Sequence, residues 1–208
     1  MNVPPYRIET ERLVLRCWKP RDAELLKDAV DSSLEHLRPW MPWAVDEPQT
    51  LDEKVELLRS FRGRFDAGTD FVYGVFDPDE SRALGGTGLH PRGGGGAALE
   101  IGYWIRADAL RRGLATELSA ALTRVGFEVC GVERMEIHVD PRNEASARIP
   151  RRLGYVEEGT LRRRLPPRRP GEPRADETFF TLLREEYDAS QLPSTPLAAY
   201  DAAGRPVL

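Results

Sequence analysis

The chain has 208 residues, of which 40% are hydrophobic and 31% charged, and its formal net charge is −4. This composition is typical of a globular protein with one sizeable core, and the charge gives no basis for nucleic-acid or membrane binding. The two cysteines, Cys17 and Cys130, cannot build a disulfide framework or a cysteine-rich zinc site. With neither an apolar signal core nor a span-length apolar run, the chain is expected to be cytoplasmic.

The N-terminal segment is predicted to begin with a strand and then to turn helical. Residues 8–18 favour a strand, because Leu13 and Leu15 alternate with polar neighbours. Pro20 and Asp22 mark the start of the first helix.

A second helix is predicted after residue 50. Thr50 is a good N-cap, and Glu53 three positions later completes a capping box. Prolines interrupt the preceding segment, 33–43, which is expected to form a loop or short helical turns. This segment carries Trp40 and Trp43, two of the four tryptophans.

The middle of the chain is predicted to be sheet. Residues 71–76, 83–90 and 98–105 read as three short strands, and turn residues at 91–96 separate the last two. Their close succession indicates an antiparallel meander.

A crossover is expected after the meander. The stretch from Gly113 to Cys130 has apolar residues at helical spacing, and residues 134–140 alternate as a strand does. A helix between two strands implies that the strands 98–105 and 134–140 are parallel, with the helix packed on the sheet.

The last third is predicted to complete the sheet. A helix starts at Asn143 and ends at Gly154, and strands are expected at 155–161 and 178–183. The loop 162–174 between these strands holds six arginines.

Together these elements predict an α/β protein of mixed α+β character. Its sheet is mostly antiparallel with one parallel crossover. We expect a single domain over residues 1–188 and a loosely ordered tail over residues 189–208.

A short basic turn, Leu110–Thr116, joins the strand 98–105 to the following helix. The first N–H groups of a helix have no partner within it, and the helix dipole is positive there. Gly113 is small, and Arg111 adds positive charge, so an anion can approach the backbone. The turn is a candidate phosphate site, although it matches neither the P-loop nor the dinucleotide-binding glycine pattern. The expected backbone donors are those of Arg112, Gly113, Leu114, Ala115 and Thr116.

Six sequence blocks follow one another between residues 8 and 188. They are E-T-E-R-L-V-L-R, L-R-P-W-M-P-W, E-I-G-Y-W-I, R-R-G-L-A-T-E, D-P-R-N-E-A-S-A-R with R-L-G-Y, and F-T-L-L-R-E-E-Y. In order and spacing they resemble the GCN5-related N-acetyltransferases (GNAT), and more narrowly the branch that acetylates the N-termini of ribosomal proteins. The resemblance implies the GNAT fold, with helices on both sheet faces, and a possible homodimer.

The resemblance also implies that acetyl-CoA is the acyl donor and that its pyrophosphate lies on the basic turn. The family motif is Q/R-x-x-G-x-G/A, whose first position here is Leu110, with Arg111 as a possible substitute. The strand backbone at Tyr103, Trp104 and Ile105 would pair with the pantetheine arm. An N–H near Trp104 or Ile105 would polarise the thioester oxygen.

Glu100 is the candidate general base and a candidate acceptor-binding residue. It shares one strand face with Gly102 and Trp104, where a cleft could make the carboxylate a better base. A solvated glutamate on a half-exposed strand is the alternative. An N-terminal acceptor needs little base strength, because an α-amine has a pKa of ~7.7–8.0 against ~10.4 for lysine.

Asn143 and Ser146 begin the next helix. Capping alone explains Asn143, whereas Ser146 lies at N3, where Glu or Gln is preferred. The resemblance implies that Asn143 contacts the pantetheine and that Ser146 assists the leaving thiolate, with Tyr155 as an alternative acid. Pro150 cannot bond the carbonyl of Ser146, so a kink is expected.

The remaining polar and aromatic residues are less specific. Trp40 and Trp43 could line an acceptor cleft or pack a loop. His36, His90 and His138 show no ligand spacing and are interpreted as surface or packing residues, so no metal site is expected. The arginine-rich loop could guide an acidic acceptor or be solvated.

The predicted reaction is therefore direct acetyl transfer from acetyl-CoA to a primary amine, best matched by a protein or peptide N-terminus. A small-molecule amine such as an antibiotic or polyamine, or another acyl group such as succinyl, is the alternative within enzymes. A non-catalytic CoA-binding regulatory module is the alternative outside them.

Overall fold

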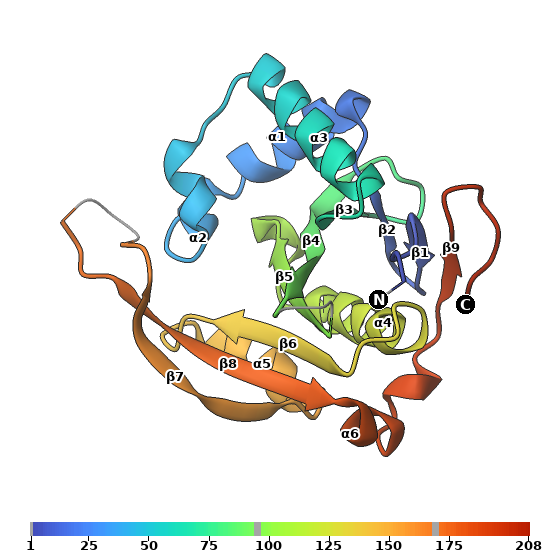
Figure 1. Ribbon diagram of the computed structural model, residues 1–208. Helices are drawn as coiled ribbons and strands as arrows, with labels where there is room; N and C mark the ends of the chain where they lie inside the picture. Colours follow the sequence, from blue (N-terminus) through green and yellow to red (C-terminus); the bar gives the residue numbers. More distant parts are fainter. Residues whose placement is uncertain (1, 94–96, 168–170) are drawn as a thin grey trace.

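The computed structural model describes residues 2–93, 97–167 and 171–208, and within them nine strands form one sheet (Figure 1). The strands are β1 (Arg7–Glu9), β2 (Val14–Cys17), β3 (Phe71–Phe76), β4 (Ala83–Arg92), β5 (Ala98–Ile105), β6 (Arg134–Val139), β7 (Val156–Leu165), β8 (Ala175–Leu183) and β9 (Ala198–Tyr200). Their spatial order is β7-β8-β6-β5-β4-β3-β2-β1-β9. Only β5 and β6 pair in parallel among the described residues, so the predicted fold class is confirmed.

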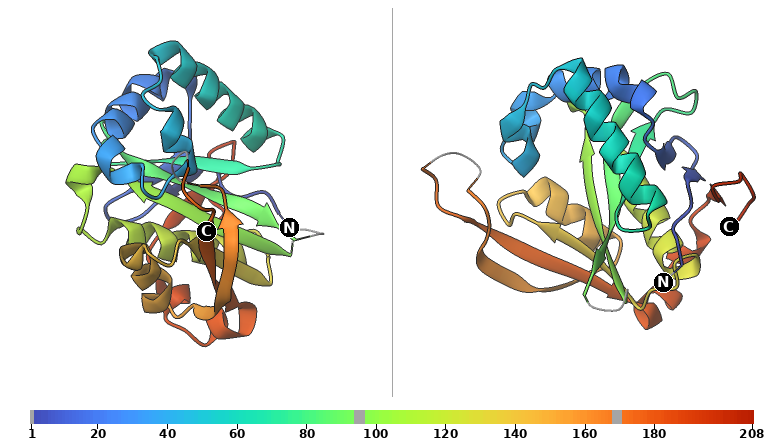
Figure 2. Two further views of the ribbon diagram at one scale, coloured as in Figure 1. Left: turned by 90° about the vertical axis from the view of Figure 1, so that its left-hand side faces the viewer. Right: turned by 45° about the horizontal axis from the view of Figure 1, so that its top comes forward.

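Helices cover both faces of this sheet. They are α1 (Ala23–Asp31), α2 (Leu34–Leu37), α3 (Leu51–Asp66), α4 (Leu114–Glu128), α5 (Glu144–Arg152) and α6 (Arg184–Asp188). In Figure 2, α1 and α3 lie on one side of the strands and α4 on the other. No helix in the described part of the chain is long and apolar enough to cross a bilayer.

The capping box predicted for the second helix is present at the start of α3. The Thr50 hydroxyl accepts a hydrogen bond from the Glu53 N–H at 3.3 Å, and the Glu53 carboxylate accepts from the Thr50 N–H at 2.7 Å. Each side chain thus satisfies a backbone donor that the helix leaves unpaired. The helix begins at Leu51, as the sequence predicts.

The single strand predicted over residues 8–18 is wrong, because this segment forms the hairpin β1–β2. Thr10 reverses the chain: its N–H donates to the Leu13 carbonyl at 2.9 Å, and its hydroxyl accepts from the Leu13 N–H at 3.1 Å. A threonine hydroxyl that bonds nearby backbone favours a turn over a continuous strand.

Strand β4 is longer than predicted, and its glycines have a steric role. A Cβ on Gly86 would lie 2.6 Å from the Trp104 indole nitrogen, and one on Gly88 would lie 2.6 Å from His90 Nε2. Both distances are shorter than real Cβ contacts. The glycines therefore clear the sheet surface so that these two rings can lie across it.

The C-terminal region differs from two expectations. Strands β7 and β8 form a long hairpin, so residues 162–165 at the start of the predicted loop 162–174 are strand, and residues 168–170 lie outside the described part. The tail expected to be loosely ordered adds β9 to the edge of β1, as Ala199 opposite Ile8. Ala199 is fully buried. The addition is favourable because an edge strand such as β1 has unpaired backbone groups that a further strand can satisfy. The predicted turn 91–96 falls partly on residues 94–96, also outside the described part.

Candidate active site

The predicted crossover β5–α4–β6 is confirmed, and its two strands separate soon after they begin. They pair only from Ala98 opposite Arg134 to Glu100 opposite Glu136. Beyond this point β5 continues to Ile105 while β6 turns away (Figure 1). The β6-facing edge of β5 is therefore left without a strand partner over its second half.

The direction of the backbone groups along β5 shows which of them face this opening. The N–H of Arg106 donates to the Leu84 carbonyl of β4 at 2.9 Å. Because backbone groups alternate sides along a strand, Trp104 also faces β4, whereas Tyr103 and Ile105 face the opening. Of the two N–H groups predicted for the thioester oxygen, the alternation leaves that of Ile105 on the open edge.

The basic turn before α4 has an unusual backbone. Arg111 (φ 60°) and Gly113 (φ 78°) both adopt the left-handed conformation, which is costly for a residue with a side chain. Helix α4 starts at Leu114, and the residues from Arg111 to Gly113 are exposed. The turn is therefore exposed directly before a helix whose first N–H groups have no partner within it, a combination that is suited to an anion.

Arg12, which the sequence reading missed, supports this turn from the β1–β2 hairpin. Its guanidinium donates to the Arg112 carbonyl at 2.8 Å and to the Glu117 carboxylate at 2.7 Å. It also lies 3.5 Å from the position that a Cβ on Gly113 would occupy. A third cation therefore stands beside the two arginines of the turn.

The start of α5 is joined to β5 through Ser146. Asn143 caps the helix by accepting the Ser146 N–H at 3.2 Å, as predicted. The Tyr103 hydroxyl lies 3.0 Å from Ser146 Oγ and donates to the Ser146 carbonyl at 3.2 Å. Pro150 has no N–H for this carbonyl, so Tyr103 replaces the missing helical donor. Burial raises the pKa of Tyr103 to about 12, so the hydroxyl is a neutral hydrogen-bonding group.

Tyr155, the alternative acid, is packed in the core. Its hydroxyl lies 2.7 Å from the Thr123 hydroxyl on α4, and the residue is 5% exposed. Burial raises its pKa well above the ordinary value. This environment matches the packing interpretation of an aromatic residue at that position.

Glu100 lies among charged groups on the sheet face that α1 and α3 cover. Its Oε2 accepts from Arg92 at 2.6 Å and lies 3.4 Å from His138 Nδ1. On the other side of the same imidazole, Glu136 lies 2.8 Å from Nε2. The hydrogen bond from His138 holds the pKa of Glu136 at about 2, whereas burial raises the pKa of Glu177 nearby.

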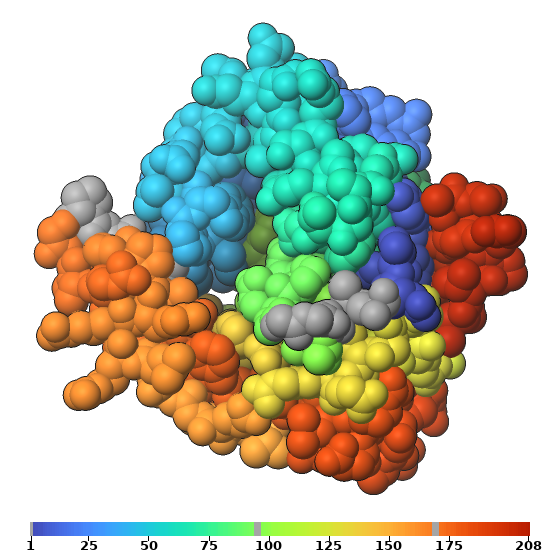
Figure 3. All heavy atoms as spheres, in the orientation of Figure 1, coloured from blue at the N-terminus to red at the C-terminus, as the bar shows by residue number. Residues whose placement is uncertain are grey.

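A cavity of about 540 Å³ lies on this same face, next to β4 and β5. Its walls come from the segment after α2, from α3 and from the two strands. Its lining includes Trp43, Asp70, His90 and Trp104. In the space-filling view, a cleft separates the blue α2 region from the orange β7–β8 hairpin (Figure 3).

The structure separates the two tryptophans of the segment 33–43. Trp43 lines the cavity and packs edge-on against Trp104, with ring centroids 5.8 Å apart. Trp40 lies in the turn after α2, where its N–H donates to the Leu37 carbonyl at 2.9 Å. Trp43 is therefore the tryptophan that an acceptor in the cavity would meet.

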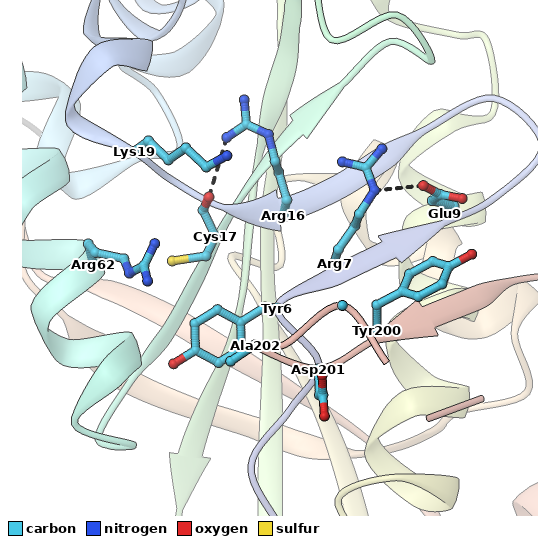
Figure 4. Close-up of a pocket in the computed structure, with 11 residues that line it drawn as sticks. Tyr6, Arg7, Glu9, Arg16, Cys17, Lys19, Arg62, Tyr200, Asp201 and Ala202 are labelled. Carbon is cyan, nitrogen blue, oxygen red and sulfur yellow. Dashed lines mark hydrogen bonds and ion pairs between the residues drawn. The ribbon is translucent and has the colours of Figure 1, made fainter. Parts of the chain in front are cut away.

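A second cavity, of about 440 Å³, lies at the β1–β9 edge of the sheet (Figure 4). Its three arginines are paired with carboxylates: Arg7 with Glu9 at 2.6 Å, Arg16 with Asp22 at 2.7 Å, and Arg62 with Asp66 at 2.7 Å. Cys17 on its wall is buried, and burial raises the pKa of the thiol to about 11. These groups are engaged in contacts that stabilise the fold.

Comparison with known proteins agrees with this geometry. A family profile described as an acetyltransferase (GNAT) domain matches residues 12–156. The [ribosomal protein uS5]-alanine N-acetyltransferase of Escherichia coli is 30% identical over 162 residues, 76% of this chain and 82% of that protein. The uncharacterized N-acetyltransferase YoaA of Bacillus subtilis is 26% identical over 155 residues, 74% of this chain and 85% of its own.

Solved structures share the same fold. A crystal structure described as a probable acetyltransferase has a TM-score of 0.77 and 26% identity, covering 85% of this chain and 96% of that one. RimJ of Mycobacterium smegmatis, in complex with CoA-disulfide, has a TM-score of 0.77 at 23% identity, covering 92% and 91%. The chain belongs to the GNAT acetyltransferase family and is an acyl-CoA-dependent N-acetyltransferase.

Proposed function

We propose that this enzyme moves an acetyl group from acetyl-CoA to the α-amine of a protein or peptide N-terminus. One observation carries the proposal: β5 has an open backbone edge next to an exposed basic turn, and a cavity on its adjoining face. A thioester held along that edge would be presented to an amine in the cavity. Proximity of this kind supplies a large part of the rate enhancement in group transfer.

The donor would be held mainly by backbone. The N–H groups from Arg112 to Thr116, with the side chain of Arg111, suit a pyrophosphate. The open edge of β5 at Tyr103 and Ile105 suits the amide groups of the pantetheine arm, which Asn143 would contact from the start of α5. Acetyl-CoA itself supplies the activated acetyl group.

Ser146 is proposed to help the thiolate leave. The hydroxyl of Tyr103, 3.0 Å from Ser146 Oγ, can hold the serine in place and share a proton with it. A short hydroxyl pair beside the open edge of β5 is suited to protonate or hydrogen-bond a thiolate.

The acceptor is proposed to bind against Trp43, Trp104 and Glu100, with Trp40 nearby in the turn after α2. Carboxylates on this face favour an incoming ammonium group over an anion. Support for an N-terminal acceptor comes from the Escherichia coli relative, whose name specifies a ribosomal-protein alanine. Glu100, which the sequence predicts as the base, contributes its carboxylate to this acceptor surface.

Free-thiol release from acetyl-CoA tests the proposal. The acceptor panel consists of hexapeptides beginning with alanine or serine, the same peptides with blocked N-termini, spermidine and kanamycin. We expect release with the free peptides and none with the blocked ones. Release only with spermidine or kanamycin would assign a small-molecule acceptor, and CoA binding without release on any amine would contradict the enzyme's proposed substrate class.

A further inference from the structure

His90 lines the cavity beside β4 and β5, whereas the sequence indicated only a surface or packing histidine. Its Nδ1 is 2.6 Å from Asp70 Oδ1, and both residues line the cavity. Its Nε2 is close to the sheet surface, 3.3 Å from the position a Cβ on Gly102 would take. The imidazole thus lies across β4 and β5, with one nitrogen held and the other beside the strand proposed to carry the thioester.

The partner of Nδ1 determines which nitrogen carries the proton. Burial alone would raise the pKa of Asp70, but the hydrogen bond with His90 and the charges of Arg64 and Arg92 bring it below its ordinary value. An ionised carboxylate can only accept hydrogen bonds, so Nδ1 carries the proton. The lone pair of the neutral ring is then on Nε2.

The glycine at position 88 and its partner at position 102 make this placement possible. The two residues face each other across β4 and β5, and a Cβ on Gly88 would lie 2.6 Å from Nε2. Any side chain at position 88 would push the ring off the strand. Gly86, Gly88 and His90 lie on one face of the strand, so the two glycines leave room for the imidazole against the sheet.

We propose that His90 Nε2 accepts the proton of the acceptor amine, with Asp70 as the residue that positions its ring. This inference rests on the proposed function of the site and names a further catalytic residue within it. The arrangement is that of a carboxylate-oriented imidazole base, in which the carboxylate fixes the tautomer.

The proton balance of the reaction is complete with this assignment. The acceptor ammonium loses one proton to Nε2, and the neutral amine attacks the thioester carbonyl. The C–N bond forms as the C–S bond breaks. The nitrogen loses its second proton as the thiolate gains one through Ser146, so the products are the amide, the CoA thiol and one proton that His90 passes to water.

Glu100 is less suited to this step than His90. The two residues are opposite each other in the β4–β5 register and so share a face. Arg92 holds Glu100 Oε2 at 2.6 Å, with His138 3.4 Å away. His90 lines the cavity itself. The charged groups that face His90 are Asp70, with Arg64 at 3.2 Å behind it, and the Arg92–Glu100 pair.

The test compares His90→Asn with Glu100→Gln in the full chain, using acetyl-CoA and whichever panel amine the wild type acetylates best. We expect His90→Asn to lower kcat/KM by about 10²- to 10⁴-fold, the usual value of a general base. In His90→Asn, the acid limb of the pH profile of kcat/KM should follow only the ionisation of the acceptor. In Glu100→Gln, this acid limb should be that of the wild type. CoA affinity should not change. His36→Asn is the matched control and should behave as wild type.

Asp70→Asn gives a second readout that does not depend on activity. An amide can donate to Nδ1 and so move the ring proton to Nε2, which ¹⁵N NMR of the histidines reports. We expect the Nδ1–H tautomer in the wild type, the Nε2–H tautomer in Asp70→Asn, and a loss of rate like that of His90→Asn.

Wild-type kcat/KM in His90→Asn, or an Nε2–H tautomer in the wild type, would overturn the assignment. A wild type that acetylates only spermidine or kanamycin would refute the N-terminal substrate but leave this test intact on that amine. If no amine is acetylated, the tautomer measurement alone decides: the Nε2–H form rejects His90 as base, and the Nδ1–H form supports it.

Discussion

The two sides of β5 are built in different ways. On the proposed donor side, the edge of the strand and the turn before α4 consist of exposed backbone, with Arg111 and Gly113 in left-handed conformations. On the proposed acceptor side, the cavity is made of side chains from β4, β5, α3 and the segment after α2. A backbone site depends on chain path, whereas a side-chain site depends on which residues meet.

This difference explains how each side tolerates change. Leu110 departs from the family motif but is exposed at the edge of the turn, so the backbone donors keep their positions. On the acceptor side, His90 and Trp104 fit only because Gly86 and Gly88 lack side chains. The donor side should therefore resist side-chain replacement and the acceptor side should not.

The largest effect on stability is expected at a buried ion pair in the wall of the cavity. Lys54 of α3 forms an ion pair with Glu47, and their side chains are 1% and 2% exposed. Lys54→Met leaves Glu47 as an uncompensated buried charge, which should lower the free energy of unfolding by about 3–5 kcal/mol. Chemical denaturation monitored by circular dichroism measures the change.

The control for this variant is on the same helix. Arg59 pairs with Glu56 in solvent, with side chains 70% and 65% exposed, so Arg59→Met should change stability by no more than ~1 kcal/mol. Adding Glu47→Leu to Lys54→Met removes the second charge and should recover most of the loss. A loss unchanged in the double variant would mean that packing, not charge, anchors the wall.

A smaller effect is expected from a charge at the donor turn. Gly113→Asp brings a carboxylate to the proposed pyrophosphate seat and should weaken CoA binding by about ten- to a hundredfold, as like charges at contact distance do. Gly113→Asn has nearly the same shape and similar tolerance of the left-handed conformation, so it isolates the charge. Isothermal titration with CoA measures both, and equal affinities would show that the anion lies elsewhere.

The donor side could be predicted from the sequence because its parts are local. The turn and the helix start at Leu114 lie within a few residues of each other, and Asn143 caps the helix that holds Ser146. Helix ends are encoded by short runs of residues. The antiparallel meander and the parallel crossover also follow from the order of the predicted elements.

The acceptor side could not be predicted in this way, because its contacts join distant segments. His90 meets Asp70 across 20 residues, and Trp104 of β5 packs on Trp43 from the segment after α2. Arg12, whose bond to Arg112 of the donor turn spans 100 residues, was missed for the same reason. One local signal was present: Gly86 and Gly88 alternate with His90 on a single face. Glycine on one face of a strand marks a place where a ring or ligand lies close to the backbone.

The contribution of Glu136 to the stability of the fold should depend on pH. His138 and Arg134 hold the pKa of Glu136 at about 2, below the ordinary 4.5. Its charged form therefore stabilises the fold above about pH 4.5, and this stabilisation is lost as the pH falls toward 2. Glu136→Gln should flatten the stability curve in this window and cost on the order of 1–2 kcal/mol at neutral pH.

Denaturation at several pH values measures this, with Glu56→Gln as the exposed control, since the Glu56 side chain is 65% exposed. CoA affinity at neutral pH should be unchanged in both variants, because Glu136 lies on the acceptor side of β5. A parallel fall in CoA affinity for Glu136→Gln would show that the two sides are not independent.

The smallest effect is expected at the aromatic contact over the cavity. Trp43→Ala removes the edge-on packing on Trp104, with its 5.8 Å centroid distance, which is worth about 0.5–1.5 kcal/mol. The acceptor KM should rise by about two- to tenfold, with little change in the KM for acetyl-CoA. Trp43→Phe keeps an aromatic edge and should recover part of the loss. If Trp43→Ala instead raises both KM values together, the tryptophan pair supports β5 as a whole, and the division between a backbone donor side and a side-chain acceptor side fails at this strand.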